Sequence, residues 1–211
     1  MSKKALLVVD MVNDFLNKDV NPSVSCPRGL SILPNVTKLA RFALESGITL
    51  IYCSDAHLPS DYELKVWGPH SMQGTKGSEI VPWLPTDNLY TIKRGETLNK
   101  VLAIKTNGPF NVEKGTYSGF RDNGGIDTAL DNLLKLKKID TLYITGLTTG
   151  ICDRHTSAEA FFRGYNIVLV EDAVEGFTAE ENEQGKAYIK ANYGARVLGT
   201  EEALTEFKNG A

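Results

Sequence analysis

Residues 141–174 of the chain read TLYITGLTTGICDRHTSAEAFFRGYNIVLVEDAV, and their pattern indicates the fold class. It opens with a short apolar run, TLYIT (141–145), of the kind that forms a buried strand. A Gly-rich turn leads into an amphipathic segment over about 150–163 that ends at Gly164, and a second apolar run, NIVLV (166–170), follows. A helix between two such runs indicates parallel strands in one sheet, with the helix on a face of that sheet.

The rest of the chain repeats this alternation. Three more apolar runs are predicted to be strands: ALLVVD (5–10), ITLIYC (48–53) and ARVLG (195–199). Helical patterns are predicted over about 34–46, over about 126–137, after Thr178 and after Thr200. We therefore expect an α/β fold with three layers, α/β/α, around a mostly parallel central sheet of five or six strands. The 211 residues suit a single domain over 1–211.

Residues 54–125 interrupt this alternation of strands and helices. The segment is rich in Gly, Pro, Asn and Ser and contains both tryptophans. Within it, 88–94 and 110–114 are predicted to be strands, and 97–105 fits a helix or a strand equally well. A long irregular segment within a compact domain usually carries function or is disordered, and the aromatic content favours function. We expect this insertion to bear part of a site at the carboxyl ends of the strands, where parallel sheets bind ligands.

The composition excludes several classes of protein. Lys and Arg total 23 and Asp and Glu total 26, so the formal net charge of −3 favours neither nucleic acid nor a membrane surface as a partner. No apolar run reaches the roughly 18 residues of a membrane-spanning helix. The apolar stretch at the start of the chain is broken by Asp10, which is too early for a signal peptide, so we expect a cytoplasmic protein.

Asp10 and Cys152 are the first candidates for catalysis. Asp10 ends the first predicted strand, where a partly desolvated carboxylate can act as a base; a turn former or helix cap explains it equally well. Asp14, nearby, is expected to be a local turn or cap residue. Cys152 falls near the start of the helix after the Gly-rich turn, where amide dipoles lower a thiol pKa and free amides can hold an oxyanion. Three cysteines cannot all pair within one chain, so Cys26 and Cys53 are expected to be buried small residues or reactive thiols.

A second group of polar residues points to a metal. Asp55 and His57 lie two residues apart at the end of a predicted strand, so they face the same side of an extended chain. His70 follows in a loop, and Glu63 is a possible fourth ligand. Two imidazoles with carboxylates suit zinc or a similar divalent ion, although surface positions would explain the histidines as well.

The third histidine and the lysines are less informative. His155 lies three residues after Cys152, but on a helix it would point along the axis rather than toward the turn, so we do not favour a Cys–His dyad. Lys114 and Lys93 each end a predicted strand, and either could pair with Asp10 at the edge of the sheet.

Four stretches together resemble the cysteine hydrolases of the isochorismatase-like superfamily, and within it the nicotinamidases. They are LLVVDMVNDF (6–15), SDAH (54–57) with WGPHSMQGTKGSEI (67–80), EKGTYSGF (113–120) and TGLTTGICDRHTSAEAFFRGYNIVLVEDAV (145–174). The resemblance implies a catalytic triad of Asp10, Lys114 and Cys152, with Lys93 as the alternative lysine. It also implies metal ligands at Asp55, His57, Glu63 and His70. It further implies a cis peptide at Leu147–Thr148 that aims the amides of Thr148 and Cys152 at an oxyanion.

The resemblance implies hydrolysis of a small carboxamide, best nicotinamide, through a cysteine thioester. Phe15, Trp67 and Tyr117 would wall a flat ring, and a divalent metal, zinc before iron or manganese, would be the cofactor. The expected partners are the amide substrate and further copies of the chain in a homo-oligomer. Ala56, Leu58 and Asp153 depart from the nicotinamidase pattern, which commonly has Val after the nucleophile. The alternatives are an amidohydrolase of N-carbamoylsarcosine or ureidoacrylate type and a non-enzymatic thiol sensor.

Overall fold

The computed structural model describes residues 3–209, and their centre is a parallel sheet. The sheet has seven strands in the order β3-β4-β2-β1-β5-β6-β7, and every neighbouring pair is parallel. The strands are β1 (Lys4–Val9), β2 (Thr49–Asp55), β3 (Tyr90–Ile92), β4 (Phe110–Lys114), β5 (Thr141–Leu147), β6 (Asn166–Glu175) and β7 (Arg196–Leu198). The prediction of five or six strands was too low, because both short runs of the 54–125 insertion join the sheet as β3 and β4.

Helices connect the strands. The longer ones are α2 (Leu33–Glu45), α5 (Leu130–Lys137), α6 (Arg154–Phe162), α7 (Ala179–Tyr193) and α8 (Thr200–Lys208). The shorter ones are α1 (Asn13–Leu16), α3 (Leu64–Trp67) and α4 (Lys100–Lys105), with single turns η1 (Pro27–Ser31), η2 (Lys76–Ser78), η3 (Asn123–Gly125) and η4 (Thr149–Asp153). The ambiguous 97–105 segment therefore forms a helix, α4. The helix predicted after Thr178 is α7, and it begins with a capping box in which Thr178 and Glu181 exchange hydrogen bonds.

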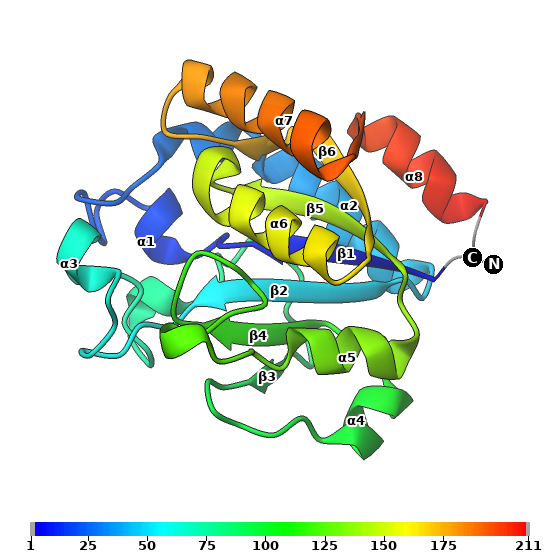
Figure 1. The fold of residues 1–211 in the computed structure, drawn as a ribbon, viewed down its shortest axis with the longest axis horizontal. Helices are drawn as coiled ribbons and strands as arrows, with labels where there is room; N and C mark the ends of the chain where they lie inside the picture. Colours follow the sequence, from blue (N-terminus) through cyan, green and yellow to red (C-terminus); the bar gives the residue numbers. More distant parts are fainter. Residues whose placement is uncertain (1–2, 210–211) are drawn as a thin grey trace.

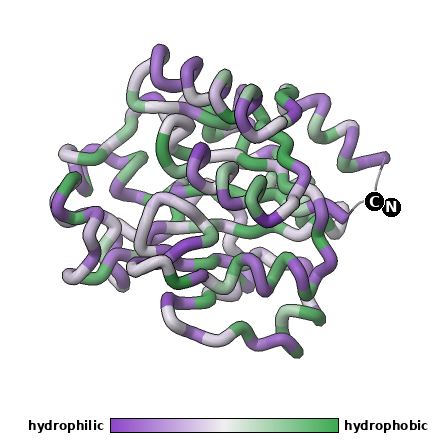
Figure 2. Tube along the Cα trace, viewed as in Figure 1, coloured by the Kyte–Doolittle hydropathy of each residue, from purple (hydrophilic) through white to green (hydrophobic). Residues whose placement is uncertain are grey.

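Alternate strand residues build two hydrophobic cores, one on each face of the sheet. In β1, Leu6 and Val8 pack with α2 and α8, whereas Leu7 and Val9 pack with α4, α5, α6 and α7. Figure 1 shows α5 and α6 in front of the sheet and α2 behind it. Hydrophobic residues follow the central strands, and hydrophilic residues follow the outer surface of the helices (Figure 2). The expected three-layer α/β/α fold is confirmed.

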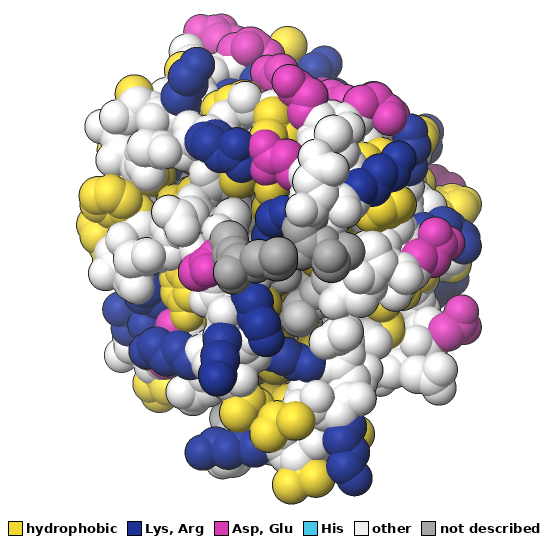
Figure 3. Space-filling view, turned by 90° about the vertical axis from the view of Figure 1, so that its right-hand side faces the viewer, with side chains coloured by type: hydrophobic (Ala, Val, Ile, Leu, Met, Phe, Trp, Pro, Cys, Tyr) yellow, Lys and Arg dark blue, Asp and Glu magenta, His cyan; other side chains and the backbone are white. Residues whose placement is uncertain are grey.

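The two ends of the sheet differ in character. Figure 3 shows the end where the chain termini lie, with basic and acidic side chains both present and no histidine visible. The carboxyl ends of the strands lie at the opposite end, on the left in Figure 1. No helix within residues 3–209 is both long and apolar enough to cross a membrane.

Candidate active site

Four candidate residues meet at the carboxyl edge of the sheet. Asp10 follows β1, Asp55 ends β2, Lys114 ends β4, and Cys152 lies in η4, the π-helical turn after β5. In a parallel sheet the ends of adjacent strands lie side by side, so residues separated by more than 140 positions become neighbours. All four side chains are buried.

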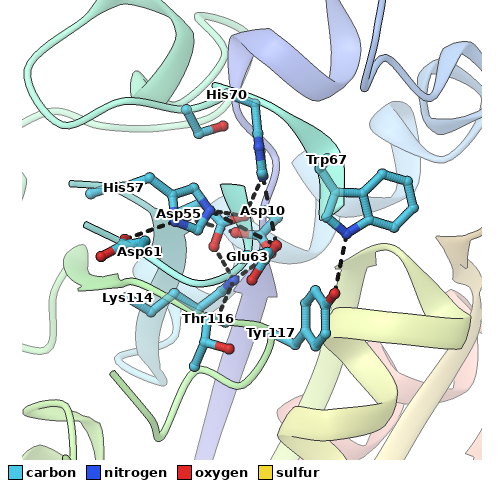
Figure 4. A network of polar contacts seen from close by, with 12 residues as sticks. Asp10, Asp55, His57, Asp61, Glu63, Trp67, His70, Lys114, Thr116 and Tyr117 are labelled. Atoms are coloured by element: carbon cyan, nitrogen blue, oxygen red, sulfur yellow. Dashed lines mark hydrogen bonds and ion pairs between the residues drawn. The ribbon is translucent and has the colours of Figure 1, made fainter. Parts of the chain in front are cut away.

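Lys114 is the centre of this group. Its fully buried ammonium contacts Asp10 Oδ2 at 2.8 Å, the Thr116 carbonyl oxygen at 3.1 Å and Cys152 Sγ at 4.0 Å. It also donates a hydrogen bond to Asp55 (Figure 4). Lys93 lies beyond the end of β3 and is exposed. The structure therefore brings Lys114, and not Lys93, together with Asp10 and Cys152.

Asp10 is held firmly. Its φ of 48° lies in the left-handed region, which an aspartate tolerates better than most residues, and this bend directs the chain away from the strand axis. Its amide donates to the Cys53 carbonyl oxygen at 2.9 Å, and its Oδ1 accepts from the Asp55 amide at 2.9 Å. Burial and the charge of Asp55 raise the pKa of Asp10 to about 7, although Lys114 opposes the shift. A pKa near neutrality suits a carboxyl group that must take up and release a proton.

Cys152 differs from the expectation in one respect. We expected the helix terminus to lower its pKa, but burial raises the pKa of the thiol well above its usual value, and Lys114 only partly opposes this. The expectation was wrong because it assumed that the turn is open to water, whereas Cys152 is 5% exposed. A protonated thiol needs a base, and the carboxylate of Asp10 lies against the same lysine. The Leu147–Thr148 peptide is cis, at the position where the resemblance places it.

The four proposed metal ligands form a compact cage beside this group. The Nε2 atom of His57 lies 3.6 Å from Asp55 Oδ2 and 3.9 Å from Glu63 Oε1. The Nε2 atom of His70 lies 3.6 Å from Glu63 Oε1 and 3.9 Å from Asp55 Oδ2. Bonds of about 2.1 Å in tetrahedral geometry would separate zinc ligands by about 3.4 Å, so the cage is close to the size that zinc needs.

Unpaired atoms in the cage support a cation there. Among the described residues, Asp55 Oδ2, His57 Nε2 and Glu63 Oε2 are buried without a hydrogen-bond partner. Each histidine instead uses its other nitrogen: His57 Nδ1 donates to Asp61 Oδ2 at 2.9 Å, and His70 Nδ1 donates to the Gly68 carbonyl oxygen at 2.9 Å. This pairing presents the lone pair of each Nε2 to the centre of the cage.

The charge of the cage points the same way. Burial acts to lower the pKa of His57, but Asp55 and Asp61 outweigh it and raise that pKa to about 9. Burial likewise acts to raise the pKa of Asp55, but Lys114 and His57 hold it below its usual range. The carboxylates of the cage thus stabilise a positive charge beside them, and a bound divalent cation would take over that role from the His57 proton. The oxygen and nitrogen donors fit zinc, iron or manganese.

A narrow cleft opens beside the cage and the thiol. Phe15, Trp67 and Tyr117, the expected ring-binding residues, all line it together with Cys152. The Trp67 indole nitrogen donates to the Tyr117 hydroxyl at 3.1 Å (Figure 4). Phe177 stacks on Trp67 with ring centroids 5.7 Å apart. The cavity has aromatic walls and opens onto both the thiol and the metal cage.

Comparisons with known proteins place the chain in a family. The isochorismatase domain matches residues 4–202. The chain belongs to the isochorismatase family.

Solved structures from this family resemble the fold closely. The N-carbamoylsarcosine amidase of Thermoplasma acidophilum is 34% identical, with a TM-score of 0.75 over 94% of this chain and 97% of that one. The nicotinamidase PncA of Bacillus subtilis is 29% identical, with a TM-score of 0.73 over 93% and 99% of the two chains. The pyrazinamidase of Pyrococcus horikoshii, solved in complex with zinc, is 26% identical, with a TM-score of 0.73 over 93% and 99%.

Sequence reasoning missed several residues of this isochorismatase-family site. Phe177 comes from the loop after β6, and Val24 and Ile151 also line the cavity, but no motif marked these apolar side chains. Asp61 was missed although it is four residues from His57, because its role appears only once the chain turns between Leu58 and Asp61. Arg94, which pairs with Asp61, was overlooked beside Lys93.

Asp14 and His155 lie near the site and make contacts that the sequence did not predict. Asp14 is not merely a local turn or cap residue, because its buried carboxylate accepts from the Ser71 amide at 2.6 Å and so holds the loop that bears His70. His155 donates from Nδ1 to the Ile151 carbonyl oxygen at 2.7 Å and packs on the Tyr117 ring. A Cys–His dyad is therefore not favoured.

Asp153 is one of the departures from the nicotinamidase pattern. It directly follows Cys152, at a position where the resemblance commonly has Val. Its side chain is completely buried, and neither carboxylate oxygen has a hydrogen-bond partner within the described part of the chain. Burial and the nearby Asp10 raise its pKa well above the usual value.

Proposed function

We propose that the protein is a metal-containing cysteine amidohydrolase that converts nicotinamide to nicotinate and ammonia. One observation carries this proposal: a single cavity with aromatic walls is lined by Cys152 and by two residues of the metal cage, Glu63 and His70. A flat ring held between these walls would present its amide carbon to the thiol and its ring nitrogen to the metal.

The proposed reaction begins with proton transfer from the Cys152 thiol to Asp10. The sulfur attacks the amide carbon, and the backbone amides of Thr148 and Cys152 hold the resulting oxyanion. Asp10 returns the proton to the leaving nitrogen, so ammonia departs and a thioester remains. Asp10 then takes a proton from water, which attacks the thioester, and the collapse releases nicotinate and restores the thiol.

Lys114 and the metal cage orient this reaction. The Lys114 ammonium holds the carboxylates of Asp10 and Asp55 together and thereby fixes the direction of the base. When bound, a divalent metal would supply a coordination position for the pyridine nitrogen. Orientation of this kind lowers the activation free energy because the reacting atoms are already aligned.

A second candidate is hydrolysis of an N-carbamoyl or ureido acid, which the 34% identity to an N-carbamoylsarcosine amidase favours. Such a substrate carries a carboxylate and needs a cationic or hydrogen-bonding anchor. Among the described residues that line the cavity there is no lysine or arginine, and most are apolar or aromatic. The cavity therefore favours an uncharged aromatic amide.

An ammonia-release assay separates the candidates. Nicotinamide, pyrazinamide, N-carbamoylsarcosine and ureidoacrylate are compared with and without a chelator. We expect turnover of nicotinamide that is lost with the chelator and restored by zinc. A metal-free protein with full nicotinamidase activity would contradict the proposed role of the metal, and activity on the carboxylate-bearing substrates alone would select the second candidate.

Variants of the cage give a matched control. His57→Ala and His70→Ala should lose both the bound metal and nicotinamide turnover. Cys152 should still react with iodoacetamide in both variants, because the defect lies in substrate placement. Loss of alkylation together with turnover would show that the cage supports the nucleophile itself.

A further inference from the structure

Arg94 connects three loops beside the metal cage. It follows β3, its side chain is 6% exposed, and its guanidinium bridges two carboxylates. Toward Asp61 it donates from NH1 at 2.6 Å and from NH2 at 3.1 Å, and toward Asp122 it donates from Nε at 3.0 Å. NH1 also donates to the Ala56 carbonyl oxygen at 3.1 Å, directly before His57. This two-sided fork is a geometry that arginine can provide and lysine cannot.

Asp61 passes this constraint to the cage. Its Oδ2 accepts from His57 Nδ1 at 2.9 Å and from the Leu58 amide at 3.0 Å, while Asn123 donates to its Oδ1 (Figure 4 shows the Asp61–His57 contact). Asp61 is only 2% exposed. With both carboxylate oxygens occupied, Asp61 cannot rotate away from His57 without breaking several bonds. The imidazole of His57 is thereby fixed with Nε2 toward the other ligands.

The end of β4 makes room for this arrangement. Gly115 directly follows Lys114, and a Cβ atom there would lie 2.3 Å from the Arg94 guanidinium carbon. Glu113, the residue before Lys114, accepts from the Arg94 amide at 3.4 Å and from Gln73 Nε2 at 2.6 Å. Three consecutive residues therefore brace the loops, hold the catalytic carboxylates and leave space for the guanidinium.

We propose that Arg94 is a positioning residue for the metal site, acting through Asp61 on the orientation of His57. The proposal rests on the metal cage of the proposed function but not on any particular substrate. Arg94 touches neither the cage centre nor the cavity, so its effect is on how tightly the cage holds a cation. Partners that orient metal-bound histidines typically change metal affinity by about 10- to 100-fold when mutated.

Zinc affinity of the intact protein, measured by competition with a chromophoric chelator, tests this proposal. Arg94→Lys, which keeps the charge and loses the fork, should weaken zinc binding by about 10- to 100-fold. Asp61→Asn should weaken it similarly. The double variant should be little weaker than either single variant, because both changes break one chain of contacts. If the losses of zinc affinity in the two single variants multiply in the double variant, Arg94 does not act through Asp61.

Arg163→Lys is the matched control. Arg163 also bridges carboxylates, with contacts to Asp127 at 2.9 Å and Glu159 at 3.1 Å, but it directly follows α6 and its ion pairs include no residue of the cage. This variant should lower the midpoint of thermal unfolding without changing zinc affinity. Equal losses of zinc affinity in the Arg94 and Arg163 variants would reduce the role of Arg94 to general stability and overturn the proposal.

Gly115→Ala tests the proposal a second way, because it disturbs the contacts of Arg94 without replacing Arg94 by another residue. Its backbone is not in the left-handed region, so the added methyl acts by displacing the guanidinium. Zinc affinity should fall while the rate of Cys152 alkylation stays unchanged. An unchanged zinc affinity would contradict the proposal. If zinc binding follows these expectations but the protein does not hydrolyse nicotinamide, the proposed substrate is wrong and the proposed role of Arg94 still holds.

Discussion

The Asp153→Asn variant tests the electrostatics around Cys152. The buried carboxyl group has no hydrogen-bond partner in residues 3–209, and burial raises its pKa well above the value of 3.8 that it has in an unfolded chain. Above pH 3.8 the unfolded state therefore releases a proton that the folded state retains. The free energy of unfolding must fall as the pH rises toward the folded-state pKa. Asparagine has nearly the same shape and does not titrate.

The magnitude follows from the linkage relation. Each pH unit between the two pKa values changes the free energy of unfolding by about 1.4 kcal/mol. From pH 5 to pH 7 the stability difference between Asp153→Asn and the wild type should therefore grow in favour of the variant by up to about 3 kcal/mol. Titrations common to both proteins cancel in that difference.

Urea denaturation at pH 5, 6 and 7 measures this difference. Asp153→Val, which removes the polar group altogether, should show the same dependence on pH. A stability difference that stays constant from pH 5 to pH 7 would mean, against this expectation, that Asp153 ionises normally inside the folded protein.

The other predictions concern Lys114, His155 and the ion pair between Arg196 and Glu206. Lys114→Ala should lose far more nicotinamide turnover than Lys93→Ala, because of these two lysines only Lys114 contacts the Asp10 carboxylate and the Cys152 thiol; the reverse order in a kcat comparison would reassign the proposed triad. His155→Ala should keep most of its kcat, since its Nδ1 is engaged by a backbone carbonyl, and a severe loss would restore the dyad. Arg196 holds the pKa of Glu206 at about 2, below its usual 4.5, so this pair contributes stability above pH 4.5 that is lost as the pH falls toward 2. Glu206→Gln should weaken the loss of stability on acidification from pH 5 to pH 3, and an unchanged acid profile in urea titrations would contradict the role of the pair.

Much of the fold could be predicted because its signals are local. The apolar runs, the glycine stops and the capping box at Thr178 each depend on a few adjacent residues, and each corresponds to a strand or helix boundary in the structure. The short strands β3 and β4 were harder to place in the sheet, since three residues such as Tyr90–Ile92 carry little periodicity. Their membership depends on pairing with strands distant in sequence.

Residues of the candidate site that lie at strand ends could be predicted from the sequence, whereas residues that lie on loops were harder to predict. Asp10 and Asp55 follow from the rule that parallel strands end at one edge. Phe177 and Arg94 come from loops whose path depends on tertiary contacts, so no spacing revealed them. The pKa of Cys152 was misjudged because burial, which a sequence does not report, outweighs the dipole of a helix terminus.

Acylation of Cys152 by nicotinamide can be observed in the intact mass of acid-quenched protein. The protein mixed with nicotinamide and quenched within the first turnovers should gain the mass of one nicotinoyl group, on the peptide that contains Cys152. Cys152→Ala should gain none and release no ammonia, whereas Cys53→Ala should behave as the wild type. Nicotinamide turnover by Cys152→Ala, or an adduct on another residue, would rule out Cys152 as the nucleophile.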